Sequence, residues 1–553
     1  MPVIELSLSR LKARTGSKVS EEEIFEALPY VGLDIEDRKE DSVSVEYSPN
    51  RPDFCSEAGI ARSLVGQLGI ETGLPKYEFL QGPIRIDVEG PEIKSVRPYV
   101  FSLHASLQVS DEVIKQLIVM QEDLHNGLGR HRGKVAIGIH NAERVKPPIK
   151  YLATNDRSYS FVPLGSSEKM TIEQILENTE QGKEYRGFLS GGLFPLLIDS
   201  SGNTLSMPPV INGELTRLKP GVRAIFVDVT ATEKKAGETT IAIIASMLSD
   251  IGAKVESVSI KNEDGSMRIT PDMLPQTMRF DLNLTNEILG LELGYGEAKS
   301  ALENSRLELM SQDQARIPKF RSDIMHPIDL VEEVELGYGV SKLKPLQTKS
   351  HLTGSLTEKT KRLRNLIDVL VGLGLTQIEN LSLTSRRELA LDQEEGLKVE
   401  NPKSQSYEFL RNQVLPSLLG VLGQSTHEEY PQRIFEQLPI FRKSASVETQ
   451  VLEEEHVAVA IADSMANYTQ ARSALDAFLR LVLGTNYEVM VSPAFDSEGI
   501  LADGRTASIS IAKGKTRVHI GKIGEVSPQV LQQLGLEVPV AAFELNLDPL
   551  LNE

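Results

Sequence analysis

The sequence predicts an α+β protein of several domains, and three observations support that fold class. The chain has 553 residues, far more than one hydrophobic core supports, so three to five domains are expected. Hydrophobic residues make up 40% and charged residues 25%, as in ordinary folded proteins. Segments with strand character alternate with amphipathic helical segments along much of the chain.

Composition excludes several classes of protein. No run approaches 18 apolar residues, so no membrane-spanning helix is expected, and the N-terminus lacks the pattern of a signal peptide. The single cysteine, Cys55, excludes an internal disulfide and a multi-cysteine zinc site, and nothing around it marks an activated thiolate. A reducing compartment fits this usage, and we predict a cytoplasmic protein.

One cluster of basic residues is a candidate nucleic-acid contact. The net charge of −19 argues against nucleic-acid binding by the whole surface, but it allows a local basic patch. An ordinary solvated face explains the same residues equally well. Aromatic residues make up only 5% and tryptophan is absent, which weakens any interpretation based on base stacking. The cluster contains Arg130, His131, Arg132, Lys134, Arg144, Lys146 and Lys150.

Residues 1–90 are the first predicted domain, a small α/β unit. Ser20 and Glu23 form a capping box that starts a helix, and Gly32 can end it. A polar loop at 48–53 precedes a second helix at about 57–68. We interpret residues 73–91 as a linker and an edge strand.

Residues 91–262 are the second predicted domain, where strands and helices alternate. The predicted strands are 98–104, 134–139 and 224–230, and the predicted helices are 111–124 and 239–251. Thr171 and Gln174 form another capping box. The tract 186–220 is rich in glycine and proline, and long tracts of this kind inside a domain are more often functional than idle.

Four carboxylates lie close together in the third predicted domain, residues 268–346. Pro327 suits the first position of a helix, which puts Asp329, Glu332 and Glu333 on one helical face. Asp323 lies just before that helix. Hard oxygen ligands of this kind suit Mg²⁺. An acidic first turn that caps a solvated helix explains the same spacing, and the pattern alone leaves both open.

Residues 350–553 are the last predicted domain. The expected helices are 357–373, 413–422 and 469–483, and the expected strands are 488–491, 507–512 and 517–523. The whole chain contains no phosphate-binding P-loop, no dinucleotide fingerprint after a strand and no Gly-x-Ser-x-Gly elbow. Pattern alone therefore gives an acidic multidomain protein with one candidate Mg²⁺ cluster.

The chain resembles the β subunit of phenylalanyl-tRNA synthetases, in their short archaeal and eukaryotic form, over nearly its whole length. The most specific match is Arg-x-Asp-Ile-x-His-x-x-Asp-Leu-x-Glu-Glu followed by Gly-Tyr, which runs from Arg321 to Tyr338. One departure is at 141–143, which read Asn-Ala-Glu where the family usually has a run similar to Asp-Leu-Asp. Further matches are Asn50–Asp53, Arg97–Tyr99, Val135–His140, Asn401–Pro402 and Gly504–Arg505.

The resemblance implies a fold for each domain and one metal site. Residues 91–262 would be an editing domain of mixed α/β, and residues 268–346 a small central winged-helix-like domain. Residues 350–553 would be a degenerate class II synthetase-like antiparallel sheet with helices. The family's Mg²⁺ ligands near the contact with the α subunit match Asp323, Asp329, Glu332 and Glu333.

The resemblance also implies an activity and its partners. It implies ATP-dependent ligation of phenylalanine to tRNA(Phe) by an α2β2 tetramer, in which the α subunit binds ATP and phenylalanine. Because residues 350–553 lack a recognisable set of ATP-clamping arginines, we assign no adenylation residue to this chain.

The chain's own implied chemistry is hydrolytic editing of mischarged tyrosyl-tRNA. The candidate pocket residues are Leu196, Ser206, Asn212, Glu214, Asp228 and Thr230. Asp228 and Thr230 alternate along one strand, so they face the same side. Two alternatives remain, a free-standing aminoacyl-tRNA deacylase and a non-enzymatic tRNA-binding scaffold. The C-terminal half argues against the first, which would not need it.

Overall fold

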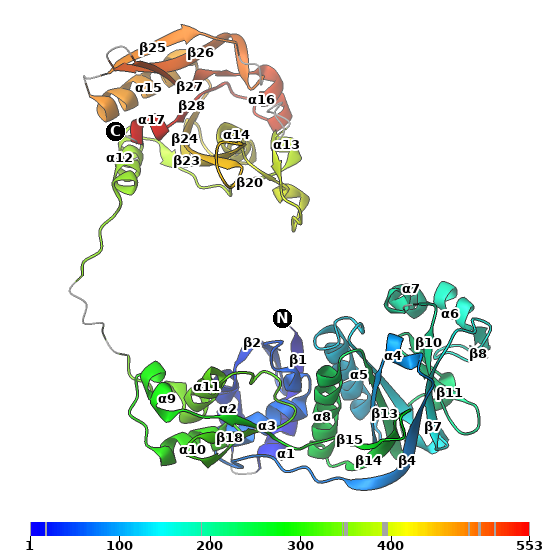
Figure 1. The fold of residues 1–553 in the computed structure, drawn as a ribbon. Helices are drawn as coiled ribbons and strands as arrows, with labels where there is room; N and C mark the ends of the chain where they lie inside the picture. The colour runs from blue at the N-terminus through cyan, green and yellow to red at the C-terminus, as the bar shows by residue number, and fades with distance from the viewer. Residues whose placement is uncertain are drawn as a thin grey trace. The chain divides into compact units, whose positions relative to one another are not determined.

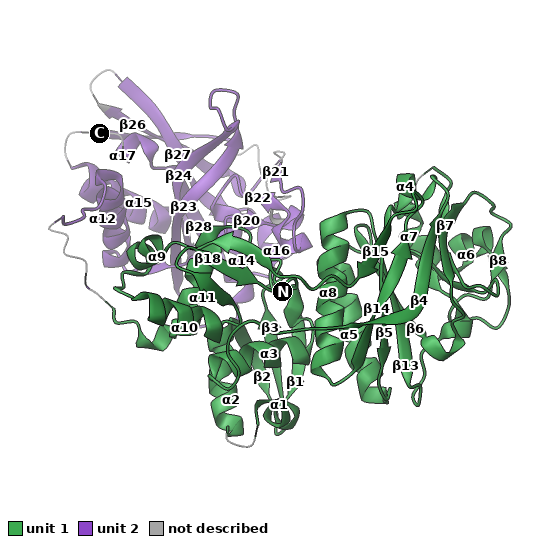
Figure 2. Ribbon diagram, turned by 60° about the horizontal axis from the view of Figure 1, so that its bottom comes forward, with its two compact units in different colours: residues 1–346 green, residues 347–553 purple. Residues whose placement is uncertain are grey.

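A computed structural model describes residues 2–551 except 17–18, 190, 346, 348–351, 390–395, 485–486, 496–498 and 514–515. The chain folds into two compact units, residues 1–346 and residues 347–553 (Figures 1 and 2). Both units mix helices with sheets, so the predicted α+β protein of several domains is confirmed as a multidomain fold of mixed helices and strands.

Unit 1 begins with a three-stranded antiparallel sheet covered by helices. Its strand order is β1 (Val3–Ser7), β3 (Ser42–Tyr47), β2 (Leu33–Arg38), and its helices are α1 (Leu8–Thr15), α2 (Glu21–Ala27) and α3 (Glu57–Gln67). The capping box of Ser20 and Glu23 starts α2, as predicted. Gly32 takes a left-handed conformation, with φ 85°, where the following 3-10 turn ends.

A ten-stranded sheet fills the middle of unit 1. Its order is β12-β11-β10-β7-β4-β14-β5-β13-β6, and β15 pairs with β14. The strands are β4 (Leu80–Glu89), β5 (Tyr99–Ser106), β6 (Val135–Asn141), β7 (Ile149–Thr154), β10 (Phe194–Ile198), β11 (Thr204–Met207), β12 (Ile211–Asn212), β13 (Ala224–Ala231), β14 (Lys254–Lys261) and β15 (Met267–Thr270). The tract 186–220, expected to be rich in loops, supplies three of these strands.

The expected edge strand within 73–91 is wrong, because β4 lies inside the sheet. It pairs in parallel with β7 on one side and with β14 on the other. Pro83 lacks an N–H and usually marks a strand edge. Here the pairing with β14 is irregular between Ser257 and Ser259, and Pro83 lies in that irregularity. A bulge accommodates proline in an interior strand.

Helices α5 (Asp111–Asn126) and α8 (Lys234–Asp250) cover one face of this sheet (Figure 1). Ile225, Val227 and Val229 of β13 join these helices and α3 in one continuous apolar core. Alternation along the strand therefore turns Phe226, Asp228 and Thr230 to the opposite face. The smaller elements of this part are α4 (Ile93–Val96), β8 (Ser160–Phe161), β9 (Met170–Thr171), α6 (Ile172–Asn178) and α7 (Glu180–Tyr185).

Unit 1 ends in a three-stranded antiparallel sheet with three helices. The sheet order is β16 (Gln276–Arg279), β18 (Gln314–Ile317), β17 (Glu308–Ser311), and the helices are α9 (Leu282–Leu289), α10 (Tyr295–Asn304) and α11 (Pro327–Tyr338). Pro327 is the first residue of α11, as predicted. Gly337 lets α11 approach α10, because a Cβ there would lie 1.8 Å from the Ala301 carbonyl oxygen.

Unit 2 is built on a seven-stranded sheet with an apolar core on each face. The sheet is antiparallel except for the pair β19–β23, and its order is β19 (Thr376–Gln377), β23 (Gln432–Lys443), β24 (Val451–Ala462), β28 (Val540–Asn546), β27 (Thr516–Val526), β26 (Leu501–Lys513), β25 (Glu488–Pro493). Helices α12 (Glu358–Gly372) and α15 (Tyr468–Leu483) pack on one face, and α14 (Leu415–Gln424) and α16 (Pro528–Leu534) pack on the other.

The remaining elements of unit 2 are short. They are β20 (Leu383–Thr384), β21 (Leu397–Lys398), β22 (Phe409–Leu410), α13 (Arg386–Leu389) and α17 (Asp548–Leu551). Across the described part of the chain, no helix combines the length and apolar character needed to span a membrane.

Candidate active site

A cavity of about 440 Å³ lies where the two ends of the ten-stranded sheet come together. Strands β6 and β13 from one end and β11 and β12 from the other line it, and α5 forms a further wall. Its size suits a small ligand or the end of a larger one. Three of the six predicted pocket residues line it: Ser206, Asn212 and Asp228.

The other three predicted residues do not line this cavity. Leu196 is buried in a neighbouring apolar cluster. The Glu214 carboxylate accepts a hydrogen bond from the Gly165 N–H at 2.8 Å. Thr230 is buried two residues beyond Asp228, where its hydroxyl accepts a hydrogen bond from Arg97 Nε at 2.9 Å. Alternation along the strand predicted the face on which Thr230 lies but not its hydrogen bond with Arg97.

Asp228 is held in the cavity wall by a chain of buried side chains. Asp228 Oδ1 lies 2.7 Å from His140 Nε2, and His140 Nδ1 lies 2.8 Å from Thr216 Oγ1. With Asp228 ionised, Nε2 donates to the carboxylate and Nδ1 accepts from the Thr216 hydroxyl. A Cβ on Gly138 would lie 2.3 Å from Asp228 Oδ1, so glycine keeps room for this arrangement.

Ser206 presents a polar atom whose hydrogen-bonding capacity is unused. The residue is 2% exposed, and within the described structure its Oγ has no hydrogen-bond partner. A buried polar group without a partner costs about 1–3 kcal/mol. A substrate group or a water molecule in the cavity would give this hydroxyl a hydrogen-bond partner.

A left-handed turn carries three residues of the basic cluster beside the cavity. Arg130, His131 and Arg132 have φ values of 48°, 51° and 66°, which non-glycine residues seldom adopt. Buried Arg97 supports the turn by donating to the Arg132 carbonyl at 3.1 Å. Burial lowers the pKa of Arg97 to about 10. Arg132 lines the cavity, and its guanidinium lies 4.3 Å from the centre of the Tyr185 ring.

Other members of the basic cluster are paired with acids. Lys134 forms an ion pair with Glu233, and Lys150 forms one with Glu89 at 3.1 Å. The cluster is therefore partly neutralised, and Arg132 is its member on the cavity wall.

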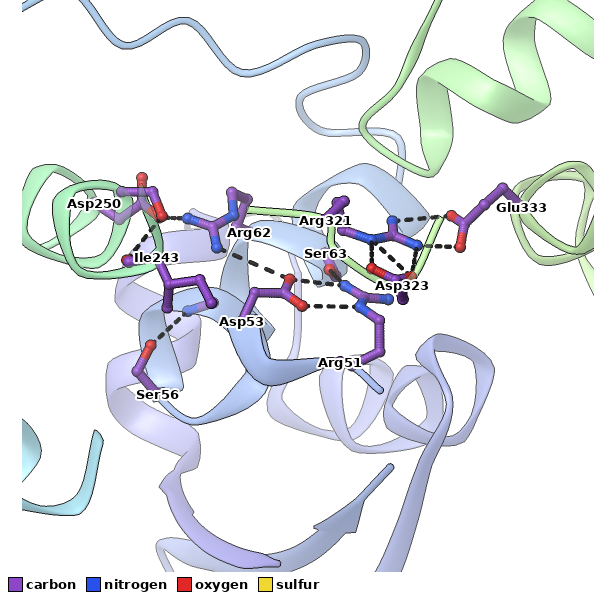
Figure 3. A network of polar contacts seen from close by, with 12 residues as sticks. Arg51, Asp53, Ser56, Arg62, Ser63, Ile243, Asp250, Arg321, Asp323 and Glu333 are labelled. Carbon is purple, nitrogen blue, oxygen red and sulfur yellow. Dashed lines mark hydrogen bonds and ion pairs between the residues drawn. The ribbon is translucent and has the colours of Figure 1, made fainter. Parts of the chain in front are cut away.

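The four carboxylates predicted to bind Mg²⁺ do not surround one point. The Arg321 guanidinium lies between Asp323 and Glu333 (Figure 3), with Nε 3.0 Å from Asp323 Oδ1 and Nη1 3.1 Å from Glu333 Oε2. Asp329 accepts the backbone N–H groups of Met325 and His326, each at 2.7 Å, at the start of α11.

The fourth carboxylate, Glu332, faces solvent. Partial burial and the neighbouring carboxylates Glu333, Asp323 and Asp329 raise its pKa. Among the residues that the structure describes, no three His, Cys, Asp or Glu side chains are grouped to hold one metal ion. The arrangement around Arg321 does not fit an Mg²⁺ ion held by all four acids, and that site stays a prediction from the resemblance.

Comparison with known proteins decides the family. A model of the phenylalanyl tRNA synthetase beta chain CLM domain matches residues 346–547, and a model of the tRNA synthetase B5 domain matches residues 278–340. The phenylalanine–tRNA ligase beta subunit of Pyrococcus horikoshii is 37% identical over 566 residues, which cover all of both chains. The chain belongs to the phenylalanyl-tRNA synthetase β-subunit family.

One further relative and one solved structure of this family agree. The beta subunit of Archaeoglobus fulgidus is 36% identical and covers 99% of this chain and 98% of its own. The crystal structure of an N-terminal fragment of the Pyrococcus horikoshii beta subunit has a TM-score of 0.58 and 35% identity, and covers 61% of this chain and 100% of its own. The resemblance read from the sequence is confirmed, and the chain is a subunit of an aminoacyl-tRNA ligase, an enzyme of protein biosynthesis.

The β-subunit motif at Asn50–Asp53 has a structural role in this chain. Arg51 donates twice to Asp53, at 2.9 Å each, and Asp53 also faces Arg62 (Figure 3). Burial raises the pKa of Asp53, but the cations of Arg51, Arg321 and Arg62 hold it below its usual range. This network joins the turn after β3 to α3, and Arg62 of α3 also lies 4.0 Å from the centre of the Phe320 ring in the segment that precedes α11.

Proposed function

We propose that this chain is the β subunit of a phenylalanine–tRNA ligase that works in an α2β2 tetramer. A catalytic α subunit would bind ATP and phenylalanine and charge tRNA(Phe). Similarity to β subunits over the entire chain supports this assignment. The sequence of residues 350–553 lacks a set of ATP-clamping arginines, so we place adenylation in the partner.

For unit 1 we propose hydrolytic editing of tyrosyl-tRNA(Phe) in the cavity beside β6. The main support is that the Asp228 carboxylate and the Ser206 hydroxyl both lie in the walls of one cavity, and that this hydroxyl has no hydrogen-bond partner within the described structure. Tyrosine differs from phenylalanine by one hydroxyl group. A site that hydrogen-bonds this hydroxyl can discriminate by about 10⁴–10⁵, because the phenylalanine ester leaves buried polar groups unpaired.

Each lining residue has a distinct role in this proposal. Asp228, oriented through His140, accepts a hydrogen bond from the tyrosine hydroxyl. Ser206 and Asn212 orient the ester and the attacking water. The water oxygen bonds to the ester carbonyl carbon, the bond to the tRNA ribose oxygen breaks, and a proton passes to that oxygen. Positioning the water supplies most of the effect, so no protein nucleophile is needed.

We also propose a role for each of the last two domains. Residues 268–346 would act as a winged-helix-like central domain. Residues 350–553 would act as a degenerate class II core that packs against the α subunit, in line with their match to the CLM model. Arg321 lies between Asp323 and Glu333 and offsets one of their two charges, so we assign Mg²⁺ no part in the hydrolysis.

The test is deacylation by the purified α–β complex of tRNA(Phe) that carries either tyrosine, the mischarged form, or phenylalanine, the correct form. Wild type should hydrolyse the tyrosyl ester much faster than the phenylalanyl ester. Asn212→Ala should slow tyrosyl hydrolysis by about tenfold, since one lost hydrogen bond costs about 0.5–1.5 kcal/mol or more when its partner stays buried. Asn155→Ala is the matched control, because Asn155 is exposed and does not line the cavity.

Two results would contradict this proposal. A wild-type complex that hydrolyses neither ester would favour the tRNA-binding scaffold. An Asn212→Ala complex that hydrolyses the tyrosyl ester at the wild-type rate would move the site away from this cavity.

A further inference from the structure

Unit 2 contains a second cavity, of about 430 Å³, on its seven-stranded sheet. Residues of β23, β24, β27 and β28 line it, together with the start of α14. Its aliphatic walls come from Leu415, Leu452, Ile500, Leu501 and Ile520. The volume suits a ligand of drug or nucleotide size.

A buried histidine–carboxylate pair lies in the wall of this cavity. His456 Nδ1 lies 2.8 Å from Glu544 Oε1. Glu544 also accepts the backbone N–H groups of Val414, at 3.0 Å, and Leu415, at 2.8 Å, at the start of α14. Burial raises the pKa of Glu544, but the hydrogen bonds from His456 and these backbone groups bring it below its usual value.

The second ring nitrogen of His456 is left without a partner. With Glu544 ionised, Nδ1 donates to it, and Nε2 is the remaining hydrogen-bonding atom. His456 is 8% exposed and lines the cavity, and in the described part of the chain its Nε2 has no hydrogen-bond partner. A buried polar atom left unpaired is costly, so this position fits an atom of a ligand.

The charges around the cavity favour an anion. Three cationic side chains, Arg442, Lys443 and Lys522, line it with two carboxylates, Glu454 and Glu544. Arg442 Nε pairs with Glu454 at 3.3 Å, and Glu544 is satisfied by His456 and the start of α14. Lys443, at the exposed end of β23, therefore supplies positive charge that the carboxylates of the cavity do not neutralise.

We propose that the unit 2 cavity binds a small organic phosphate of nucleotide size. The phosphate pairs with Lys443, the apolar body lies against the aliphatic walls, and a polar atom of the ligand hydrogen-bonds His456 Nε2. The site is one of binding, with no reaction assigned. It lies wholly within unit 2, so it is independent of the editing proposed for unit 1.

Calorimetric titration of the full chain, without an α subunit, with adenosine monophosphate tests the proposal. One saturable site per chain is expected, with affinity that weakens as salt is added. His456→Asn should weaken binding at least tenfold, because the asparagine amide can still reach Glu544 but offers nothing at the Nε2 position. Lys443→Ala should weaken it similarly, and because Lys443 is exposed this variant should fold normally.

Lys403→Ala is the matched control, because Lys403 is an exposed lysine of the same unit outside the cavity. It should leave the affinity unchanged. Inorganic phosphate should bind at least tenfold more weakly than the nucleotide, since it makes no contact with the aliphatic walls. No saturable nucleotide binding, or unchanged affinity in either the His456 or the Lys443 variant, would overturn the proposal. Equal affinity for inorganic phosphate would overturn the assignment of a nucleotide-sized ligand.

Discussion

At the scale of single residues, Arg321 decides how the acidic motif of this family is used here. Spacing along the sequence places Asp323, Asp329, Glu332 and Glu333 close together but does not show what lies between them. The Arg321 guanidinium binds two of them, and Asp329 caps α11. The capped helix start that the spacing suggested is therefore present, the Mg²⁺ site stays a prediction, and the Arg321 side chain offsets one of the negative charges of the cluster.

His125 is a second residue whose role only the fold reveals. Its Nε2 accepts the backbone N–H of Ile137 at 2.9 Å, so the buried ring joins the end of α5 to β6 beside the cavity. Burial lowers the pKa of His125. The neutral ring is thus the form that the folded protein favours.

This pKa shift predicts a stability loss in mild acid. A histidine whose folded pKa is depressed contributes stability above its unfolded pKa, about 6.5, and loses it as pH falls toward the folded value. The free energy of unfolding of wild type should fall more between about pH 7.5 and 5.5 than that of His125→Gln, which keeps an acceptor for Ile137 and does not titrate. Denaturant unfolding at the two pH values measures this difference.

The control for this prediction is His427→Gln, since His427 is largely exposed. It should leave the pH dependence of wild type unchanged. A His125→Gln protein with the same pH dependence as wild type would show that His125 carries no such linkage.

At the scale of elements, most of the helices and strands that local signals predicted are present in the structure, and long-range contacts explain the exception. The capping boxes at Ser20 and Thr171 and the proline at the start of α11 mark helix starts correctly, because these signals act within one turn. The interior position of β4 was not predicted, since its partners β7 and β14 come from distant segments of the chain.

The candidate site was also predicted only in part from the sequence. Ser206, Asn212 and Asp228 were found from family resemblance and strand alternation, which report the face of a strand. Arg97, His140 and Thr216 were not assigned roles. Arg97 contacts Thr230, and His140 contacts Asp228 and Thr216. These contacts span 76 to 133 residues of sequence, and no local pattern reports such distances.

Packing of α10 against α11 gives a prediction at this scale. Gly337→Ala should lower the free energy of unfolding by about 1–3 kcal/mol or more, because the added Cβ meets the backbone of Ala301 and the helices must separate. Thermal unfolding monitored by circular dichroism measures the change.

Gly296→Ala, in α10, is the matched control. Its Cβ would meet nothing within 4 Å, so the helix propensity of alanine should raise stability by about 0.5–1 kcal/mol. Equal effects of the two substitutions, in sign and size, would contradict the role given to Gly337.

At the scale of the whole molecule, the two units divide the work of a ligase subunit. Unit 1 holds the cavity to which we assign editing and the network around Asp53, and unit 2 holds the sheet that we assign to packing against the α subunit. Full-length similarity to β subunits makes the free-standing deacylase the weaker alternative, because such an enzyme would not need unit 2.

The assignment of editing to the unit 1 cavity is tested most directly by single-turnover hydrolysis of tyrosyl-tRNA(Phe) by the α–β complex carrying Asp228→Ala. The rate should fall by about 10²-fold or more, because Asp228 positions the tyrosyl group through its hydroxyl, and a shift of about 1 Å in a bound substrate can cost that much even when the lost contact is far from the ester. Charging of tRNA(Phe) with phenylalanine should stay at the wild-type rate, and Asp264→Ala, an exposed aspartate of the same domain, should change neither rate. Unchanged tyrosyl hydrolysis in a folded Asp228→Ala complex would contradict the assignment of editing to this cavity.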